Sequence, residues 1–167
     1  MRTPTLDRDS HLCRFALTGM LILLVEPGSA RADDLAKYYQ PNRCGPIALY
    51  AVCRAYRIET TIAELADLSA SDENGTTIAG LVDAAEANGL VAKAYLSSIR
   101  HLQRLEGPAI IDFPRGHFCV LFAWKDGKAW ILDPPRPTRL VSSAELQKQW
   151  NQHVIVFSAP RQGKRGS

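Results

Sequence analysis

The sequence predicts an α+β fold in which N-terminal helices pack on an antiparallel sheet. In the first half of the chain, apolar residues recur about every four positions, and this spacing is typical of amphipathic helices. The second half has short apolar runs bounded by turn residues, which is typical of strands. Helices followed by antiparallel strands define the α+β class.

Four helices are expected in the first half, beginning at Cys44, Thr61, Thr76 or Thr77, and Ser98. The first has an apolar stripe of Ile47, Ala51, Ala55 and Ile58. Thr61 and Glu64 have the spacing of a capping box, in which each residue satisfies a free backbone N–H near the other. Gly89 is well placed to end the third helix.

Four strands are expected in the second half, over residues 108–113, 117–124, 128–132 and 153–158, with a late helix over 143–150. Asp126-Gly127 is a strong hairpin signal, because glycine accepts the backbone angles of a tight two-residue turn. The second and third strands therefore form a hairpin in which facing residues have numbers that sum to about 253.

Length and charge narrow the classes of function. A chain of 167 residues has room for one domain of ordinary size. The stretch between Asp33 and Pro160 holds 13 basic and 14 acidic residues, so the domain lacks the basic excess of a nucleic-acid binder. Residues 161–167 form a short basic tail, which we interpret as a flexible terminus.

Residues 1–32 have the pattern of a secretory signal peptide. Arginines precede an apolar run of 11 residues (15–25), and Ala30-Arg31-Ala32 follows as a cleavage site. An uncleaved anchor or a buried helix is the alternative, but 11 residues rise only about 16 Å as a helix, against about 30 Å of hydrocarbon. We expect export, with a mature domain over 33–160 outside the cytoplasm.

Cys44 is the first candidate for chemistry. It opens the first predicted helix in Cys44-Gly45-Pro46, and proline fits the first turn of a helix. The helix dipole and free N–H groups at that end favour thiolate, the reactive form of cysteine. Gly45 would also let a substrate carbonyl approach the backbone closely. The alternative is a small apolar residue at a helix start.

His117 and Asp133 are expected at one end of the predicted hairpin. His117 begins the first strand of this hairpin, and Asp133 ends the partner strand before Pro134-Pro135. In the expected register His117 lies opposite position 136, within a few residues of Asp133 on the partner strand. A base and the carboxylate that orients it require such proximity. With Cys44, they predict a Cys-His-Asp triad.

These motifs resemble those of the C39 peptidases, papain-like domains best known from bacteriocin-processing exporters. The likeness is carried by Asn42 to Pro46, Gly116-His117-Phe118 and Leu132-Asp133-Pro134, and it spans roughly Gln40 to Phe157. The resemblance implies that Cys44 attacks the peptide carbonyl, His117 transfers the proton and Asp133 holds the imidazole. It also implies a papain-like fold and peptide or protein substrates.

The resemblance leaves some points open. In the family, a glutamine that stabilises the oxyanion usually stands where this chain has Tyr38, so Gln40, the nearest glutamine, is the candidate here. Family members often cut after double-glycine leader peptides, but they do so on the cytoplasmic side, fused to a transporter. An ABC-type exporter acting in trans is therefore one expected partner. A non-catalytic peptide-binding module is the main alternative, and an exported structural protein with paired cysteines is a third.

The remaining cysteines and histidines are expected to be structural. Cys53 falls on the far side of the first helix from Cys44, whereas Cys119 shares a strand face with His117 and is either a buried small residue or a neighbour of the site. A Cys53–Cys119 disulfide is left open. The chain has no Cys-x-x-Cys or His-x-x-x-His spacing and no glycine-rich phosphate loop, so neither a metal site nor a nucleotide cofactor is expected.

Overall fold

The computed structural model describes residues 40–159. The predicted signal peptide (1–32), the first residues of the predicted domain and the basic tail (161–167) lie outside the described residues. Within 40–159, no helix combines the length and the apolar character that crossing a membrane requires.

Helices come first along the chain, and strands dominate the second half. The elements are η1 (Pro41–Arg43), α2 (Cys44–Ala55), α3 (Ile62–Leu68), α4 (Ile78–Ala87), β1 (Val91–Leu96), α5 (Ile99–Leu102), β2 (Ala109–Phe113), β3 (His117–Lys125), β4 (Lys128–Leu132), β5 (Arg139–Ser142), α6 (Ser143–Gln149) and β6 (His153–Ser158). The strands form one sheet in the order β1-β6-β2-β3-β4-β5, and every pair is antiparallel. The predicted α+β architecture is confirmed.

The helix ends follow the local sequence. Thr61 and Glu64 form the predicted capping box at the start of α3, with both reciprocal hydrogen bonds present. Thr77, rather than Thr76, caps α4 by accepting a hydrogen bond from the Gly80 N–H. Gly89 follows α4 with φ of +82°, a left-handed conformation that favours glycine.

Two strands, β1 and β5, were not predicted. Both lie at the edges of the sheet and bury little: Ala92 is the one buried residue of β1, and Val141 is that of β5. An edge strand buries few side chains and needs no long apolar run. The predicted first helix also differs slightly, because α2 ends at Ala55, three residues before Ile58.

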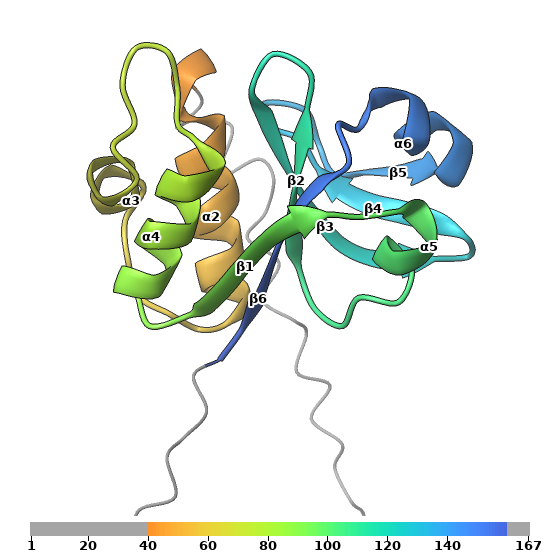
Figure 1. The fold of residues 1–167 in the computed structure, drawn as a ribbon, viewed down its shortest axis with the longest axis horizontal. Coiled ribbons are helices and arrows are strands. Elements are labelled where there is room, and N and C mark those ends of the chain that lie inside the picture. Colours follow the sequence, from red (N-terminus) through yellow and green to blue (C-terminus); the bar gives the residue numbers. More distant parts are fainter. Residues whose placement is uncertain (1–39, 160–167) are drawn as a thin grey trace, which may run out of the picture.

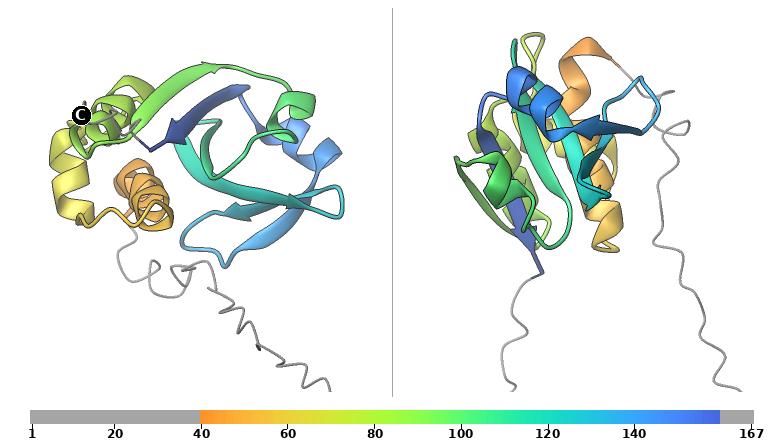
Figure 2. Two further views of the ribbon diagram at one scale, coloured as in Figure 1. Left: turned by 90° about the horizontal axis from the view of Figure 1, so that it is seen from below. Right: turned by 90° about the vertical axis from the view of Figure 1, so that its right-hand side faces the viewer.

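The sheet has an apolar core on each face. On one face, α2, α3 and α4 pack against Ile110, Val120 and Ile155. On the other, α5 and α6 contribute Leu102 and Leu146 to a second cluster. Figure 1 shows the two helical groups on opposite sides of the sheet, and the views in Figure 2 show that the sheet is strongly curved. The start of α2 thereby meets the start of β3, where the candidate site lies.

Candidate active site

Cys44 is the first residue of α2, a helix of 12 residues with Pro46 in its first turn. Its side chain is buried, and Sγ lies 3.6 Å from the carbonyl oxygen of Gly116, the residue before β3. The preceding loop is fixed by two hydrogen bonds: Nδ2 of Asn42 donates to the Asp72 carbonyl at 3.1 Å, and Ser71 Oγ donates to the Asn42 carbonyl at 3.3 Å. The thiol is therefore held at the positive end of the helix, against β3.

Close packing around the first turn of α2 requires a glycine at position 45. A Cβ at this position would collide with the Cγ2 methyl of Thr76 and crowd Leu81 and Phe118. Glycine is needed here because the first turn of α2 packs tightly against α4, the segment before it and β3.

His117 and Asp133 are hydrogen-bonded, with 2.6 Å between Nε2 of His117 and Oδ1 of Asp133. They come from neighbouring strands, since β3 begins at His117 and β4 ends one residue before Asp133. The Asp133 side chain is 3% exposed and that of His117 is 29% exposed. The carboxylate is thus fixed behind the ring, while part of the imidazole remains open to solvent.

A register shift in the hairpin brings these two side chains to one face. From Lys125↔Lys128 to Ala123↔Trp130 the partners follow the predicted sum of 253, but beyond the irregularity the pairs are Leu121↔Ile131 and Val120↔Leu132. Continuing that register places Asp133 opposite Cys119, which shares the face of His117. Without the shift, Asp133 would face Val120 and point toward α2.

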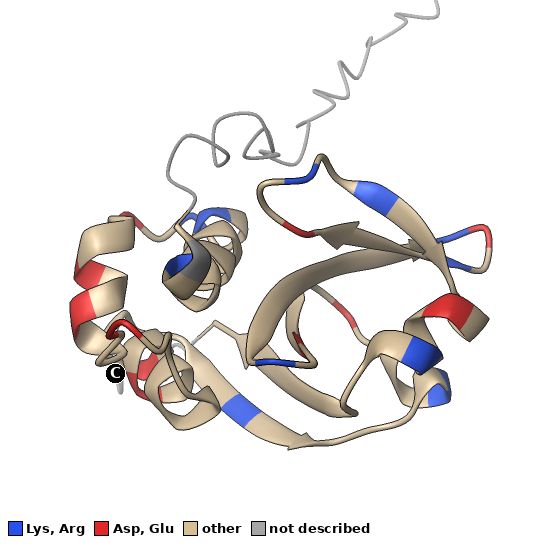
Figure 3. Cartoon of the chain, turned by 90° about the horizontal axis from the view of Figure 1, so that it is seen from above, with Lys and Arg blue, Asp and Glu red and all other residues tan. Residues whose placement is uncertain are grey.

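Two arginines stabilise the negative charge of the Asp133 carboxylate. Arg136 Nη1 donates to Oδ2 of Asp133 at 2.7 Å, and Arg139 Nη2 lies 3.8 Å from the same oxygen. Burial alone would raise the pKa of this carboxyl, but the hydrogen bonds from His117 and Arg136 lower the pKa to about 2. Figure 3 shows Lys and Arg along the connection between β4 and β5 and at the start of β5. The carboxylate therefore stays ionised at any pH near neutrality.

The surroundings of His117 favour imidazolium. The hydrogen bond with Asp133 is the main cause that raises the pKa of His117, followed by interactions with Cys119 and Cys44, against burial, which lowers the pKa. The Phe113 ring stacks on the imidazole with centroids 6.3 Å apart. Because Nε2 is bonded to Asp133, Nδ1 is the ring nitrogen left for the thiol.

The same contacts act in the opposite sense on Cys44. Burial works to raise the pKa of its thiol, but hydrogen bonding with His117 and with the backbone of Phe118, together with the charge of His117, lowers the pKa below 9.0. A lowered thiol pKa beside a raised histidine pKa favours a thiolate–imidazolium pair, the form in which a cysteine nucleophile is activated. His117 thus interacts with Asp133 on one side and with the Cys44 thiol on the other.

The other two cysteines are buried and unpaired. Cys53 lies in the core on the face of the sheet that α2, α3 and α4 cover, and Cys119 lies in the core on the opposite face. The disulfide left open by the sequence is therefore absent from the structure, since the sheet separates the two thiols. Burial raises the pKa of each to about 11. Cys119 is also a neighbour of His117 and Asp133, so it combines the two roles considered for it.

Gln40 stands immediately before η1 and is exposed. Its backbone carbonyl accepts a hydrogen bond from the Arg43 N–H at 2.9 Å, which closes the turn that leads to Cys44. Arg136 and Arg139 also contribute to the site through Asp133 and were not predicted from the sequence. Their positions in Asp133-Pro-Pro-Arg-Pro-Thr-Arg, three and six residues after the carboxylate, were the available signal.

Among residues 40–159, His117, Cys119 and Asp133 are the one group whose donor atoms could hold a metal ion, all lying within 4.8 Å of one another. The carboxylate oxygens already accept from His117 and Arg136, and two guanidinium groups lie beside them. A cation would have to displace both hydrogen bonds and approach two positive charges, so the surroundings disfavour a metal here.

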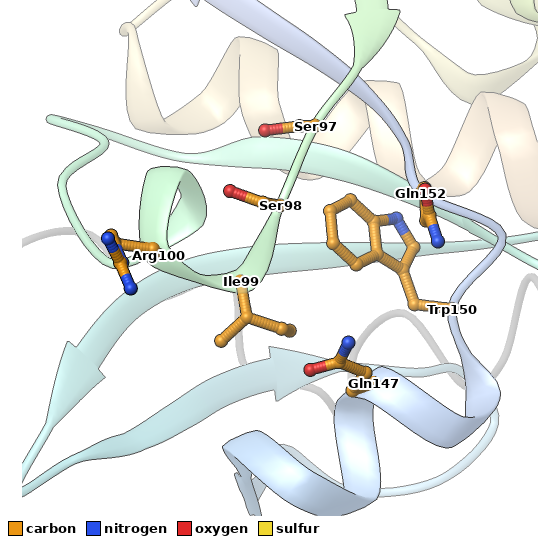
Figure 4. A pocket seen from close by; sticks show the side chains of 7 residues that line it. All are labelled: Ser97, Ser98, Ile99, Arg100, Gln147, Trp150 and Gln152. Carbon is orange, nitrogen blue, oxygen red and sulfur yellow. The ribbon is translucent and has the colours of Figure 1, made fainter.

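Two pockets help to locate the site. One, of about 310 Å³, is lined by His117 and Asp133 together with basic residues. A larger one, of about 380 Å³, lies between the start of α5 and the end of α6, with Ser97, Ser98 and Trp150 among its walls (Figure 4). This larger pocket has neither a cysteine nor a histidine in its lining, so the smaller pocket, which His117 and Asp133 line, is the candidate substrate-binding pocket.

The fold is that of papain-like peptidase domains. The profile of the Peptidase C39 family matches residues 35–162 of the 167. The chain belongs to the peptidase C39 family.

Solved structures agree with this assignment. The chain is similar to the peptidase domain of Streptococcus ComA, a bifunctional ABC transporter of a quorum-sensing pathway, with a TM-score of 0.67 and 26% identity over 74% of this chain and 95% of that domain. It is also similar to a double-glycine-motif protease from an AMS/PCAT transporter in complex with its leader peptide, with a TM-score of 0.66 and 25% identity over 71% and 85% of the two chains.

Curated relatives differ in how much of their length this chain covers. An uncharacterized protein of Methanothermobacter marburgensis is 34% identical over 68% of this chain and 80% of its own length. The lactococcin-G-processing and transport ATP-binding protein LagD of Lactococcus lactis is 27% identical over 73% of this chain but only 18% of its own length. The chain thus corresponds to less than a fifth of LagD.

Proposed function

We propose that this protein is a cysteine peptidase in which Cys44 is the nucleophile, His117 the acid–base group and Asp133 the residue that orients His117. The observation that carries the proposal is the hydrogen bond between His117 and Asp133 beside a thiol of lowered pKa at a helix start. The partial exposure of His117 leaves the pair accessible to a substrate.

The reaction follows from these contacts. The Cys44 thiolate attacks the carbonyl carbon of the scissile bond, and the carbonyl oxygen becomes an oxyanion. Imidazolium at His117 protonates the departing amine as the C–N bond breaks, leaving a thioester on Cys44. Neutral His117 then takes a proton from water, whose oxygen attacks the thioester, and the acid product leaves with Cys44 restored. Asp133 keeps the ring oriented and stabilises its positive charge throughout.

Gln40 is the proposed side-chain donor to the oxyanion, with the backbone N–H of Cys44 as the second donor. Its position one turn before Cys44 supports this role, because the turn closed by the Gln40 carbonyl and the Arg43 N–H joins the two residues. Gln40→Ala is expected to lower the turnover rate by about 10²-fold if the amide binds the oxyanion. An unchanged rate would assign the oxyanion to backbone donors alone.

Double-glycine leader peptides are the proposed substrates, because a solved relative at 25% identity is a double-glycine-motif protease in complex with a leader peptide. The transporter relatives support an ABC-type exporter as a partner in trans. The experiment is incubation of the purified protein with a peptide containing Gly-Gly, followed by mass spectrometry of the products. Cleavage is expected with wild type and Cys53→Ala but not with Cys44→Ala. Cleavage by Cys44→Ala would overturn the assignment.

A non-catalytic peptide-binding role is the second candidate, favoured by the exposure of Gln40, which leaves the oxyanion site less enclosed than the thiol. Titration of the same peptide into wild type and Cys44→Ala separates the two roles. Binding by both without any product identifies a binding module, whereas product from wild type alone identifies the peptidase.

We further propose that the mature protein is exported by the signal at residues 1–32, on the strength of its arginine-flanked apolar run. Expression of the full chain followed by cell fractionation and N-terminal sequencing tests this. A mature chain that begins at Asp33 outside the cytoplasm is expected. A full-length chain that stays in the cytoplasm would contradict export and would leave the peptidase assignment intact.

A further inference from the structure

The pocket beside the triad is strongly basic. Its volume is about 310 Å³, and Arg136, Arg139 and Lys148 line it together with Phe113, His117 and Asp133. Arg136 and Arg139 follow β4 along the chain, whereas Lys148 comes from the last turn of α6. Three cationic side chains from two separate segments therefore converge on one pocket that includes the proposed acid–base residue.

The acidic groups at this pocket do not balance its positive charge. Asp133 is the one carboxylate in the lining, and it is already shared by His117, Arg136 and Arg139. Glu145 of α6 pairs with Arg139 at 3.2 Å from outside the lining. Lys148 is exposed and makes no ion pair with any of residues 40–159.

A second observation points to an anion. The Nε atom of Arg139 is buried and has no hydrogen-bond partner among the described residues. A buried donor without a partner is costly, and a charged acceptor would satisfy it best. Figure 3 shows the contrast across the molecule: acidic positions lie on α3 and α4, whereas Lys or Arg positions lie along the connection from β4 to β5.

The chemistry of the proposed reaction defines which part of a substrate meets this pocket. His117 must protonate the departing amine, so the amine nitrogen and the residue attached to it lie against the imidazole. The pocket has His117 as one of its walls. One extended residue spans about 3.3 Å, so the side chains of the first one or two residues after the scissile bond can enter the pocket.

We propose that this pocket is a specificity subsite that binds the carboxylate of an Asp or Glu side chain directly after the scissile bond. Lys148 and Arg139 would contact the carboxylate, while Arg136 is held by Asp133. This inference rests on the proposed peptidase function and deepens it by naming the residue class that follows the cut. A charge-assisted contact of this kind corresponds to about a tenfold preference for Glu over the isosteric Gln.

The test uses four C-terminally amidated peptides that are identical except for Glu, Gln, Ala or Lys at the position after Gly-Gly. For wild type, kcat/KM for the Glu peptide is expected to exceed that for the Gln peptide about tenfold, and the ratio should fall as salt screens the charges. Amidation ensures that the varied side chain supplies the only carboxylate difference between the peptides. Equal rates for Glu and Gln would overturn the proposal.

Reversing the charge of Lys148 tests whether this residue causes the preference for Glu over Gln. In Lys148→Glu the ratio of Glu to Gln is expected to fall to about one or below, and the Lys peptide should become preferred over Gln. Lys93→Glu is the matched control, because it makes the same charge change on β1, at the opposite edge of the sheet from β5. A preference that survives in Lys148→Glu, or that is lost equally in both variants, would contradict this subsite.

Failure of the peptidase proposal can be distinguished from failure of the subsite. If no peptide is cleaved, binding of the four peptides to Cys44→Ala and to Cys44→Ala/Lys148→Glu is measured by calorimetry. Preferential binding of the Glu peptide that depends on Lys148 would retain the anion subsite and remove the peptidase. Equal binding of Glu and Gln peptides would remove the subsite as well.

Discussion

Nε2 of His117 and Oδ1 of Asp133 lie 2.6 Å apart because the β3–β4 hairpin changes register between Leu121 and Ala123. The shift turns Asp133 onto the face that carries His117, behind the ring and away from solvent. Since the carboxylate also binds Arg136, it remains charged while it orients the imidazole. The irregularity thus determines which side chains form the site.

Asp133→Asn is expected to lower kcat/KM by about 10²–10⁴-fold with little change in the fold. The amide is nearly isosteric with the carboxylate, but it lacks the charge that stabilises imidazolium and can hold the ring in the wrong tautomer. The measurement is peptide cleavage, together with circular dichroism to confirm folding.

Asp112→Asn is the matched control for this change. Asp112 also pairs with a histidine, at 3.1 Å from Nδ1 of His153, but this pair lies outside the lining of the pocket beside His117 and Asp133. Its amide variant should keep wild-type activity. An equal loss of activity in both variants would mean that the effect of Asp133→Asn is structural.

The pH dependence of alkylation reports the state of the thiol. Because the pKa of Cys44 is lowered and that of His117 is raised, the ion pair is expected from just above the Cys44 pKa up to the His117 pKa. Iodoacetamide should therefore label Cys44 with a midpoint below pH 9.0, the ordinary value for a thiol. Cys53 and Cys119 should react only on unfolding, since both are buried with pKa values near 11.

His117→Ala is expected to move the midpoint for Cys44 to higher pH, because it removes the hydrogen bond and the charge that lower the thiol pKa. Labelling is followed by mass spectrometry of tryptic peptides under native conditions. A midpoint that does not move in His117→Ala would show that the helix start alone sets the pKa.

The positions of Cys44, His117 and Asp133 in the fold were predictable because these residues lie at element ends that the sequence marks clearly. Pro46 marks the start of α2, and Asp126-Gly127 fixes the hairpin so that His117 and Asp133 share one end. The resemblance to the C39 peptidases pointed to the same three residues. The register shift near Phe122 carries no equivalent signal, since a run such as Phe118 to Trp124 is apolar at nearly every position.

The guanidinium groups around Asp133 and the edge strands were harder to predict for different reasons. Arg136 and Arg139 act through the path of the chain after β4, and turn residues alone do not specify that path. Strands β1 and β5 each bury one side chain, so their sequences lack the alternation that identifies a strand. Contacts made through tertiary structure, rather than local propensity, account for these differences.

Acid stability should depend on Asp133. Its pKa is lowered from 3.8 to about 2, so the carboxylate stabilises the folded state above pH 3.8, and this stabilisation is lost as the pH falls toward about 2. The shift corresponds to an unfolding free energy on the order of 2 kcal/mol. Urea unfolding at pH 2 to 6 should show a steeper acid loss for wild type than for Asp133→Asn. Parallel curves would indicate that other carboxylates dominate.

Gly45→Ala is expected to destabilise the protein by about 1–3 kcal/mol, the usual cost of overpacking a filled core. The added methyl would overlap Cγ2 of Thr76, and Leu81 and Phe118 leave little room for it to move. Urea unfolding at neutral pH measures the loss. Thr76→Ser removes the Cγ2 methyl but keeps a hydroxyl that can donate to the Ser69 carbonyl, as Thr76 does at 3.0 Å. Gly45→Ala/Thr76→Ser should therefore recover part of the loss. A double variant no more stable than Gly45→Ala would place the conflict at Leu81 or Phe118 instead.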